Sequence, residues 1–542
     1  MILTINNEKK EYNHPVKLIE IASSDDCCAK VNGTIRDLNY IVNKDATVEF
    51  LKLDNPDAVR IYEATIRYLL VMAVYNLYKC ANVRINYSIS MALYIDLSSI
   101  DKQLDSDEIN VIKEEMNRLI KLDLPFNRLS LKKEEAIKRY EAQGMYDKIA
   151  MLRYRNEDIV HGYECDGFYN YMYSHMLPRS SYVKDFNLFP YFPQMILQYP
   201  RSETNGKIPV FNYEQNKYSK VLFKAKSWAK SNNISNIFDL NDRICNGEAI
   251  DLINLCEFKH NRALVHIGDS IERKKDEIKL IAVSGPSSSG KTTFANKLRI
   301  ELMGRGFKPV MISLDNYYKD LDDCPIDEFG EVDFETIEAL DIERFNKDML
   351  DLIYGKETEL PVFNFKTHKR DGSKKKQLDK NGGLIIIEGI HALNEKMHHL
   401  ISRDQKYKIF ISPQQQINID DNNPIRITDI RLIRRAVRDN VFRGYGVTET
   451  LEIWPSVRRG EFKYIYTCQE DADFIFNSEL AYELCVLKKH ALPLFQSVKR
   501  ENKYFTNANR IVKFLKYFVD IDEDFVPCNS ILREFIGGSC FK

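Results

Sequence analysis

The chain has 542 residues, of which 44% are hydrophobic and 29% are charged, and its formal net charge is −1. This length exceeds what one hydrophobic core supports, so we expect a globular protein of three or four domains. The near-zero net charge excludes an overall field that would draw the whole molecule onto nucleic acid or a membrane.

The cysteines and the N-terminus indicate where the protein resides. Eleven cysteines are scattered without a C-x-x-C spacing, which fits neither a disulfide framework nor a zinc site. Residues 1–6 lack the charged and apolar regions of a signal peptide. No run of about 18 uncharged apolar residues predicts a membrane span. We therefore expect a cytoplasmic protein without membrane contact.

Residues 1–54 form a short, strand-rich first segment. Residues 2–5 predict one strand, and the alternating residues 48–50 predict another. Residues 16–22 lie between them and predict a helix. The segment is therefore expected to be a small β-rich domain.

Residues 55–200 mix helix and strand and predict an α+β domain. Residues 60–78 have helical spacing. Asp105 and Glu108 form a capping pattern in front of a second helix. Residues 201–270 are mostly helical and predict a connector to the next domain.

The sequence GPSSSGKTT at 285–293 has the spacing of a P-loop. A strand-like apolar segment precedes it and a helical pattern follows, as a phosphate-binding loop requires. Lys291 is expected to reach the terminal phosphates and the Thr292 hydroxyl to ligate Mg²⁺. The loop is expected to bind the phosphates of a nucleotide through Gly285, Ser287, Ser288, Ser289, Gly290, Lys291, Thr292 and Thr293.

The region around the P-loop alternates between strands and helices. Short apolar runs predict buried parallel strands at 278–283, 310–314, 384–387, 408–411 and 474–476. This pattern is typical of a doubly wound α/β domain, which we place at 271–500. Residues 501–542 are expected to form a mixed tail.

Two acids follow predicted strands of this domain. Asp315 comes directly after the strand at 310–314, where α/β sheets bind ligands. It could take a proton from an attacking hydroxyl or help to hold Mg²⁺, and the alternative is a helix N-cap. Glu388 ends the strand at 384–387 and is a candidate partner of Mg²⁺ and its waters.

An arginine-rich helix follows these strands. Its arginines share one helical face, at i, i+3, i+4 and i+7: Arg431, Arg434, Arg435 and Arg438. Only one acid, Asp439, lies close by to neutralise them. This pattern favours a lid that closes on a phosphoryl group, and the alternative is a solvated charged face.

The region 278–480 resembles the uridine kinase and phosphoribulokinase family of P-loop kinases. The matching motifs stand in the family's order: GPSSSGKTT, ISLDNYY (312–318), DFETIEALD (333–341), PVFNFKTHKR (361–370), IIIEGIHALN (385–394) and RLIRRAVRDNVFRG (431–444). The resemblance implies ATP and Mg²⁺ as cofactors, with Mg²⁺ held by Thr292 and Glu388 through phosphates and water.

The resemblance also implies roles for individual residues. Asp315 would be the general base toward a 5′-hydroxyl and would act with Lys291 and Arg438. Substrate contacts would come from Asp333, Glu335, Phe363, His368, Arg370, Arg435 and Arg443. Several positions depart from the family pattern and leave the acceptor open: Phe363, Asn364, Tyr445 and Ile453.

The front of the chain resembles a different family. Residues 1–54 resemble a TGS domain, a small β-grasp module, through AKVNGTIRDL (29–38) and KDATVEFL (44–51). Residues 55–200 resemble the editing-type domain of threonyl-tRNA synthetase. That domain's zinc ligands correspond here to Ala64, Tyr68, Met172 and Met176, which do not bind zinc. A retained fold used for regulation, RNA contact or assembly is therefore expected, and we expect a homo-oligomer.

Three functional hypotheses remain open from the sequence. The first is ATP-dependent phosphorylation of a nucleoside such as uridine or cytidine at its 5′-hydroxyl. The second keeps the transfer but changes the acceptor to another small alcohol, such as a sugar phosphate or a vitamin precursor. The third is an RNA-associated regulator that contacts RNA through residues 1–200, and the near-neutral charge argues against it.

Overall fold

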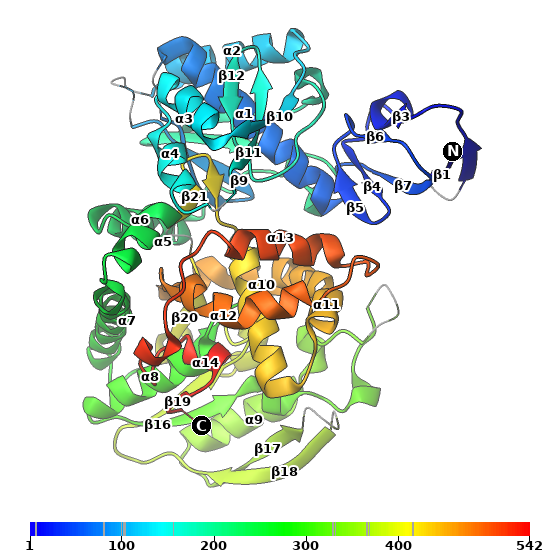
Figure 1. Ribbon diagram of the computed structural model, residues 1–542. Helices are drawn as coiled ribbons and strands as arrows, with labels where there is room; N and C mark the ends of the chain where they lie inside the picture. Colours follow the sequence, from blue (N-terminus) through cyan, green and yellow to red (C-terminus); the bar gives the residue numbers. More distant parts are fainter. Residues whose placement is uncertain are drawn as a thin grey trace.

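The computed structural model describes residues 1–541 except for 6–7, 80–81, 99, 101–103, 156, 328–329, 331, 365–366, 368 and 415–416. The chain forms a small N-terminal β unit, a mixed α and β unit beside it, and a large α/β unit that the rest of the chain builds (Figure 1). We call the first two units the front half and the third, whose sequence resembles P-loop kinases, the kinase unit.

The N-terminal unit is a five-stranded sheet around a small core that includes Leu3, Leu38 and Val48. Its strand order is β2-β1-β7-β4-β5, with β1 and β7 parallel. The strands are β1 (Ile2–Ile5), β2 (Glu8–Glu11), β4 (Cys28–Val31), β5 (Thr34–Arg36) and β7 (Ala46–Leu51). The two strands predicted in this segment are confirmed.

The helix predicted at 16–22 is wrong. Residues Val16–Lys17 form strand β3, which pairs with β6 (Ile41–Val42), and Leu18–Glu20 form a single 3-10 turn. Val16 is buried opposite Val42. Pairing with a distant segment therefore overrides the local helical pattern, which is common for β-branched residues.

The second unit is built on the long helix α1 (Pro56–Tyr78). The Asn55 side chain accepts a hydrogen bond from the Asp57 N–H, and Pro56 occupies the first turn, so the start of the helix is well specified. Two sheets pack around α1. The first has three strands in the order β10 (Asn127–Lys132), β11 (Ile159–Cys165) and β12 (Phe168–Asn170). The second has four strands in the order β13 (Asn187–Tyr191), β14 (Gln194–Gln198), β9 (Ala92–Asp96) and β8 (Arg84–Ile89).

Three shorter helices complete this unit: α2 (Ser106–Lys121), α3 (Lys133–Ala142) and α4 (Tyr146–Leu152). The predicted cap of α2 is confirmed, since the Asp105 carboxylate accepts a hydrogen bond from the Glu108 N–H at 2.9 Å. The connector is helical as predicted, with α5 (Asn216–Ser231), α6 (Ile237–Cys245) and α7 (Ala249–Glu272). It runs along one side of the molecule (Figure 1).

The kinase unit contains a parallel five-stranded sheet of order β16-β19-β15-β20-β23. Its strands match the five predicted apolar runs: β15 (Leu280–Ser284), β16 (Lys308–Ser313), β19 (Gly383–Glu388), β20 (Lys406–Ser412) and β23 (Phe474–Asn477). Helices cover the sheet, as the apolar strands require. They are α8 (Lys291–Gly304), α9 (Ile342–Ile353), α10 (Ile427–Arg438), α11 (Val447–Gly460) and α12 (Glu483–Gln496).

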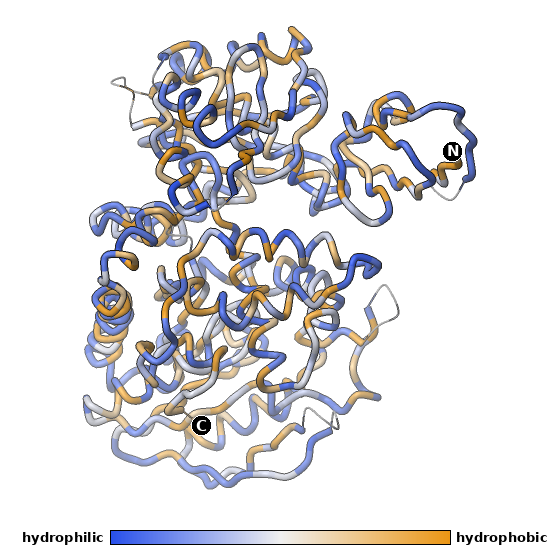
Figure 2. The backbone as a smooth tube through the Cα atoms, viewed as in Figure 1, coloured by the Kyte–Doolittle hydropathy of each residue, from blue (hydrophilic) through white to orange (hydrophobic). Residues whose placement is uncertain are grey.

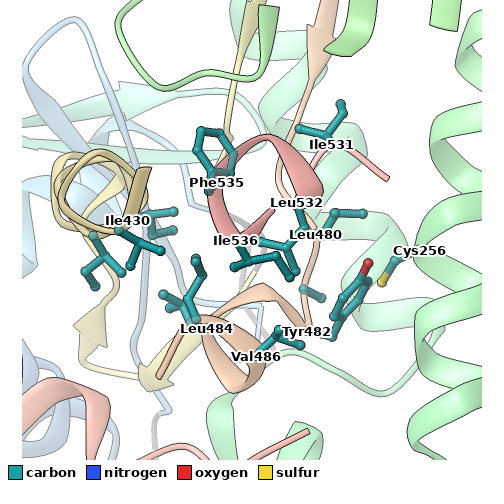
Figure 3. Packing of buried hydrophobic residues seen from close by; sticks show 14 of the residues in the cluster. Cys256, Ile430, Leu480, Tyr482, Leu484, Val486, Ile531, Leu532, Phe535 and Ile536 are labelled. Carbon is teal, nitrogen blue, oxygen red and sulfur yellow. The ribbon is translucent and has the colours of Figure 1, made fainter. Parts of the chain in front are cut away.

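The C-terminal segment packs into the core of the kinase unit. It contains α13 (Phe505–Leu515) and the short helix α14 (Arg533–Ile536). Side chains of α14 and the residues before it are buried against α10 and α12, as Figure 3 shows for Ile531, Leu532, Phe535 and Ile536 beside Ile430, Leu480 and Leu484. The tail expected at 501–542 therefore shares one hydrophobic core with the kinase unit.

A small hairpin joins the two halves. Strands β21 (Asn418–Asp420) and β22 (Asn423–Pro424) leave the kinase unit and reach the second unit (Figure 1). The Lys148 ammonium lies 2.7 Å from the Asp420 carboxylate, and both side chains are buried. Arg426, just after the hairpin, pairs with Glu63 of α1 at 2.6 Å. Charge-assisted contacts of this kind give the interface between the halves a defined geometry.

The hydropathy of the chain differs between the interior strands and the outer hairpin. Apolar segments run through the interior strands, whereas the outer hairpin of β17 (Thr358–Asn364) and β18 (Lys369–Lys376) is largely hydrophilic in its second strand (Figure 2). No helix in the described part of the chain combines the length and apolar character that a membrane span requires.

Candidate functional site

The P-loop connects β15 to α8 at the carboxyl edge of the parallel sheet. A Cβ at Gly285 would lie 1.9 Å from the Ile411 carbonyl oxygen of β20, so only glycine fits there. Gly290 has φ of 88° and forms the N-cap of α8, a conformation that favours glycine. The loop therefore presents the first amides of a helix at a strand end, which is where anions bind.

Lys291 folds back over the loop. Its ammonium group donates hydrogen bonds to the carbonyl oxygens of Gly285 and Pro286, at 3.0 and 3.1 Å. Burial lowers the pKa of Lys291, and the carboxylates of Glu388 and Asp315 oppose that shift. The side chain is thus held against the loop, with the carboxylates of Glu388 and Asp315 close to it.

Asp315 and Glu388 come together in front of Lys291. Asp315 lies two residues after β16 and Glu388 is the last residue of β19, the neighbouring strand, in which it pairs with Ser313. Burial raises the pKa of Asp315, against the attraction of Lys291, Arg443 and Arg438. Burial and the nearby Asp315 charge raise the pKa of Glu388 to about 7. Two carboxylates with raised pKa values facing one lysine are typical of a functional site.

The donor set at this edge fits Mg²⁺ shared with phosphates. Asp315 and Glu388 supply hard oxygens, and the Thr292 side chain is exposed at the start of α8. No group of three or more His, Cys, Asp or Glu side chains within the described ranges forms a complete metal cage. Mg²⁺ in such a site takes its other ligands from phosphates and water.

Glu335 and Asp333 lie beside the same edge. The Glu335 backbone N–H donates to the Asp333 carboxylate at 3.0 Å. Burial raises the pKa of Glu335 to about 7, against the attraction of Arg435 and Lys291. The His391 ring contacts the Glu335 carbonyl oxygen at 2.9 Å, and the sequence analysis did not single out this histidine.

Three arginines converge on Asp439 near the P-loop. Arg438, Arg435 and Arg443 lie 2.8, 3.2 and 3.5 Å from its carboxylate, which is fully buried. Arg435 also donates to the Ser287 hydroxyl of the P-loop at 2.8 Å. One acid facing three guanidinium groups leaves an excess of positive charge beside Asp315, as a phosphoryl-binding site needs.

The other two arginines of α10 have a different role. Arg431 and Arg434 are fully buried. Arg431 pairs with Glu461 and Arg434 with Glu483 at 2.9 and 3.0 Å. The expectation that all four arginines form one lid face is therefore wrong for this pair, because the structure neutralises them with acids distant in sequence.

These two buried arginines support the P-loop from behind. The Arg431 guanidinium donates to the Ser287 carbonyl oxygen at 2.9 Å, and that of Arg434 to the Ser288 carbonyl oxygen at 3.4 Å. Both arginines bond to carbonyl oxygens of the loop and leave its backbone N–H groups to other partners. The pair holds the loop in shape and cannot swing as a lid does.

The structure places the residues predicted to contact a nucleoside in different surroundings. Phe363 is buried, and its ring lies 5.7 Å from that of Tyr318, three residues after Asp315. Arg370 pairs with Asp341 at 2.7 Å on the outer hairpin. His368 lies outside the described residues. Phe363 is thus linked to the Asp315 segment, while Arg370 contacts the start of α9.

The C-terminal segment contributes a residue that no sequence signal indicated. The Glu534 carboxylate of α14 accepts a hydrogen bond from the Thr293 backbone N–H at 3.0 Å. This N–H belongs to the first turn of α8, where a phosphate oxygen would bind. Ile531 lies against Gly290 in the same region. An acidic side chain therefore occupies one anion position of the P-loop.

The corresponding positions in the front half are apolar. Ala64, Tyr68, Met172 and Met176 are all buried in one hydrophobic cluster. The Tyr68 hydroxyl donates to the Phe168 carbonyl oxygen at 2.6 Å. The place that the resemblance assigns to metal ligands is therefore filled by packing side chains.

The kinase unit matches a known family of proteins. A family model described as Phosphoribulokinase / Uridine kinase family matches residues 280–481. The uridine kinase of Borrelia duttonii is 34% identical over 200 residues, which cover 36% of this chain and 85% of that protein. A solved structure of a possible uridine kinase from Bacillus stearothermophilus is 16% identical, with a TM-score of 0.26, over 38% of this chain and 100% of its own.

The front half matches a different group of proteins. The threonine–tRNA ligase of Desulforamulus reducens is 30% identical over 158 residues, which cover 28% of this chain. The chain spans about a quarter of that ligase, since the match covers 25% of it. The similarity therefore concerns a part of the ligase and not the whole enzyme.

Proposed function

Because the chain belongs to the phosphoribulokinase and uridine kinase family, we propose that it transfers the terminal phosphoryl group of ATP to the 5′-hydroxyl of a pyrimidine nucleoside. The observation that carries this proposal is the convergence of Lys291, Asp315 and Glu388 at one edge of the parallel sheet. A nucleotide-binding loop alone would not need the two acids.

Asp315 has the position of a general base. It lies opposite Lys291 and within the field of Arg438 and Arg443. In the proposed step the acceptor oxygen bonds to the γ-phosphorus, the bond from that phosphorus to the bridging oxygen breaks, and ADP leaves. The acceptor proton passes to Asp315. Burial raises the pKa of Asp315, which makes its carboxylate a better proton acceptor.

The cations supply the electrostatic part of the reaction. Lys291 would contact the β- and γ-phosphates, and Arg438 and Arg443 would face the moving phosphoryl group. Mg²⁺, held through Thr292, Glu388 and the phosphates, would neutralise part of the developing charge. Catalysis of this type depends on positioning and charge, and the groups for both are present at this edge.

The acceptor side is formed by Glu335 and Phe363. Glu335 has a carboxyl suited to hydrogen-bond the hydroxyls of a ribose. Phe363 offers an aromatic face beside Tyr318 for a planar base. Because Phe363 has no hydroxyl, the base itself is weakly specified, and this favours a second candidate function in which another small alcohol is the acceptor.

An acceptor screen tests both functions. The purified protein is incubated with Mg²⁺ and ATP and with uridine, cytidine, purine nucleosides, sugar phosphates or pantothenate, and phosphorylated products are identified by mass. Phosphorylation of uridine and cytidine that is lost in Asp315→Asn supports the first function. Phosphorylation of a non-nucleoside alone supports the second, and transfer that survives Asp315→Asn contradicts the site.

A further inference from the structure

A large cavity lies between the two halves, away from the P-loop. Its volume is about 760 Å³, which is in the range of small-molecule and cofactor sites. Its walls come from the N-terminal sheet, the second unit, the start of α10 and the helix α13. In Figure 1, α13 lies on the face of the kinase unit that is turned toward the front half. Both halves of the chain therefore contribute to the cavity.

The cavity is strongly basic. Ten lysine and arginine side chains line it, against four carboxylates. All four carboxylates already have arginine partners: Asp57 with Arg60, Glu63 with Arg426, Glu157 with Arg155, and Asp429 with Arg510. The protein as a whole has a net charge of −1, so this positive charge is a local feature.

Four cations that converge from three elements form what we call the basic cluster: Arg36 of β5, Arg128 of β10, and Lys513 and Lys516 at the end of α13. Burial lowers the pKa of Lys513, and the charges of Arg128, Arg36 and Lys516 lower it further. An anion bound among these four cations would offset their mutual repulsion.

Several arginines of the cavity also have unused donors. The Nε atoms of Arg36, Arg60 and Arg510 are buried and donate to no acceptor in the described part of the chain. Burial, and then the charge of Arg510, lower the pKa of Arg60 to about 10. A buried donor without a partner costs free energy, and an oxygen-rich anion would satisfy several of them at once.

One wall of the cavity is aromatic, and we call it the aromatic wall: Tyr171, Tyr173, Phe514 and Tyr517. Both halves build it, since the Tyr171 and Tyr517 hydroxyls are hydrogen-bonded at 2.6 Å and the Tyr173 ring lies 6.1 Å from that of Tyr517. These contacts fix the rings in place. A flat base can stack on such a wall at little entropic cost.

We propose that this cavity binds a mononucleotide, with its phosphate at the basic cluster and its base on the aromatic wall. A phosphate suits the cluster better than a carboxylate does, because it carries more charge and more acceptor oxygens. The base explains why an aromatic wall lies beside the cations. The size of the cavity fits one nucleotide and excludes a folded RNA.

Binding to the full-length protein tests this proposal. Calorimetric titrations use uridine 5′-monophosphate, adenosine 5′-monophosphate, uridine, inorganic phosphate and a single-stranded RNA of twelve nucleotides. The Lys291→Ala variant separates this site from the P-loop. We expect a monophosphate to bind with micromolar affinity in the native chain and in Lys291→Ala, and about tenfold more tightly than uridine or inorganic phosphate.

Charge reversal identifies the site. In Arg128→Glu with Lys513→Glu, both exposed side chains, we expect monophosphate affinity to fall about thirtyfold. The matched control reverses Lys121 and Lys347, which are exposed elsewhere, and should change the affinity little. The milder pair Arg128→Gln with Lys513→Gln should give an intermediate loss, and thermal melting checks that each variant is folded.

Two results would overturn the proposal. One is monophosphate binding that survives charge reversal of the basic cluster, whether or not it disappears in Lys291→Ala, since the P-loop or the proposed acceptor site beside it would then be the binding site. The other is binding of the RNA without binding of any mononucleotide, which would assign the cluster to an RNA partner.

Discussion

The two halves of the chain have similar identity to their relatives, 34% for the kinase unit and 30% for the front half, but differ in what fills the key positions. In the kinase unit, charged groups meet at a sheet edge around Lys291 and Asp315. In the front half, Tyr68 and Met172 are packed in an apolar core. Sequence identity to a relative therefore indicates the fold, whereas a few side chains decide whether that fold can carry out a reaction.

The largest expected effect comes from removing a charged group of the kinase unit's site. We expect Lys291→Ala to lower kcat/KM for phosphoryl transfer about 10³-fold, because a preorganised cation facing the phosphates is lost. The measurement is a coupled ADP-release assay at saturating acceptor. Lys121→Ala, an exposed lysine of the front half, is the matched control. Near-native turnover of Lys291→Ala would refute the assigned site.

The pH dependence of kcat/KM should reflect the ionisation of Glu388, which lies beside Lys291 and Asp315. The Glu388 carboxyl, with its pKa raised to about 7, is mostly protonated at pH 6 and mostly ionised at pH 8. The proposed Mg²⁺ site needs the ionised form, so kcat/KM should rise about tenfold from pH 6 to pH 8. A flat profile over this range, with ATP and acceptor below their KM values, would show that no such ionisation controls the step.

A front-half substitution should affect stability and not catalysis. Tyr68→Phe removes the hydroxyl that donates to the Phe168 carbonyl oxygen and leaves the ring packed. We expect the free energy of unfolding to fall by about 1 kcal/mol and phosphoryl transfer to remain unchanged. Denaturant unfolding and the kinase assay give the two readouts. A large loss of activity would mean that the apolar core of the front half takes part in the reaction.

The smallest expected effect concerns the C-terminal segment. The Glu534 carboxylate uses the Thr293 N–H, and a phosphate must compete for it. Glu534→Gln removes the negative charge, so the KM for ATP should fall about threefold. Glu501→Gln, an exposed acid of the same segment, is the control. A raised KM in Glu534→Gln would indicate that this carboxylate assists nucleotide binding instead of opposing it.

Much of the kinase unit follows from local sequence. The five apolar runs became the five parallel strands, and the GPSSSGKTT motif became a loop between β15 and α8. Asp315 and Glu388 could be placed together because each follows a strand, and the carboxyl ends of parallel strands meet at one edge. These predictions needed only short-range patterns and one rule of sheet geometry.

The errors and omissions all involve long-range contacts. Val16 pairs with Val42 and so forms a strand where the local pattern favours a helix. Arg431 and Arg434 have the same sequence appearance as Arg438, yet their acids lie 30 and 49 residues away and make them part of the core. No spacing rule links an arginine to an acid at such distances.

The sequence by itself determined that this protein has a P-loop at a strand end, acids at neighbouring strand ends and no zinc ligand at four matched positions of the front half, because these are properties of residue type and local spacing. Only the tertiary structure decided that Glu534 reaches Thr293, 241 residues earlier, and that the two halves enclose a basic cavity. Such features depend on contacts between residues far apart in the sequence, and only the packing of the folded chain brings those residues together.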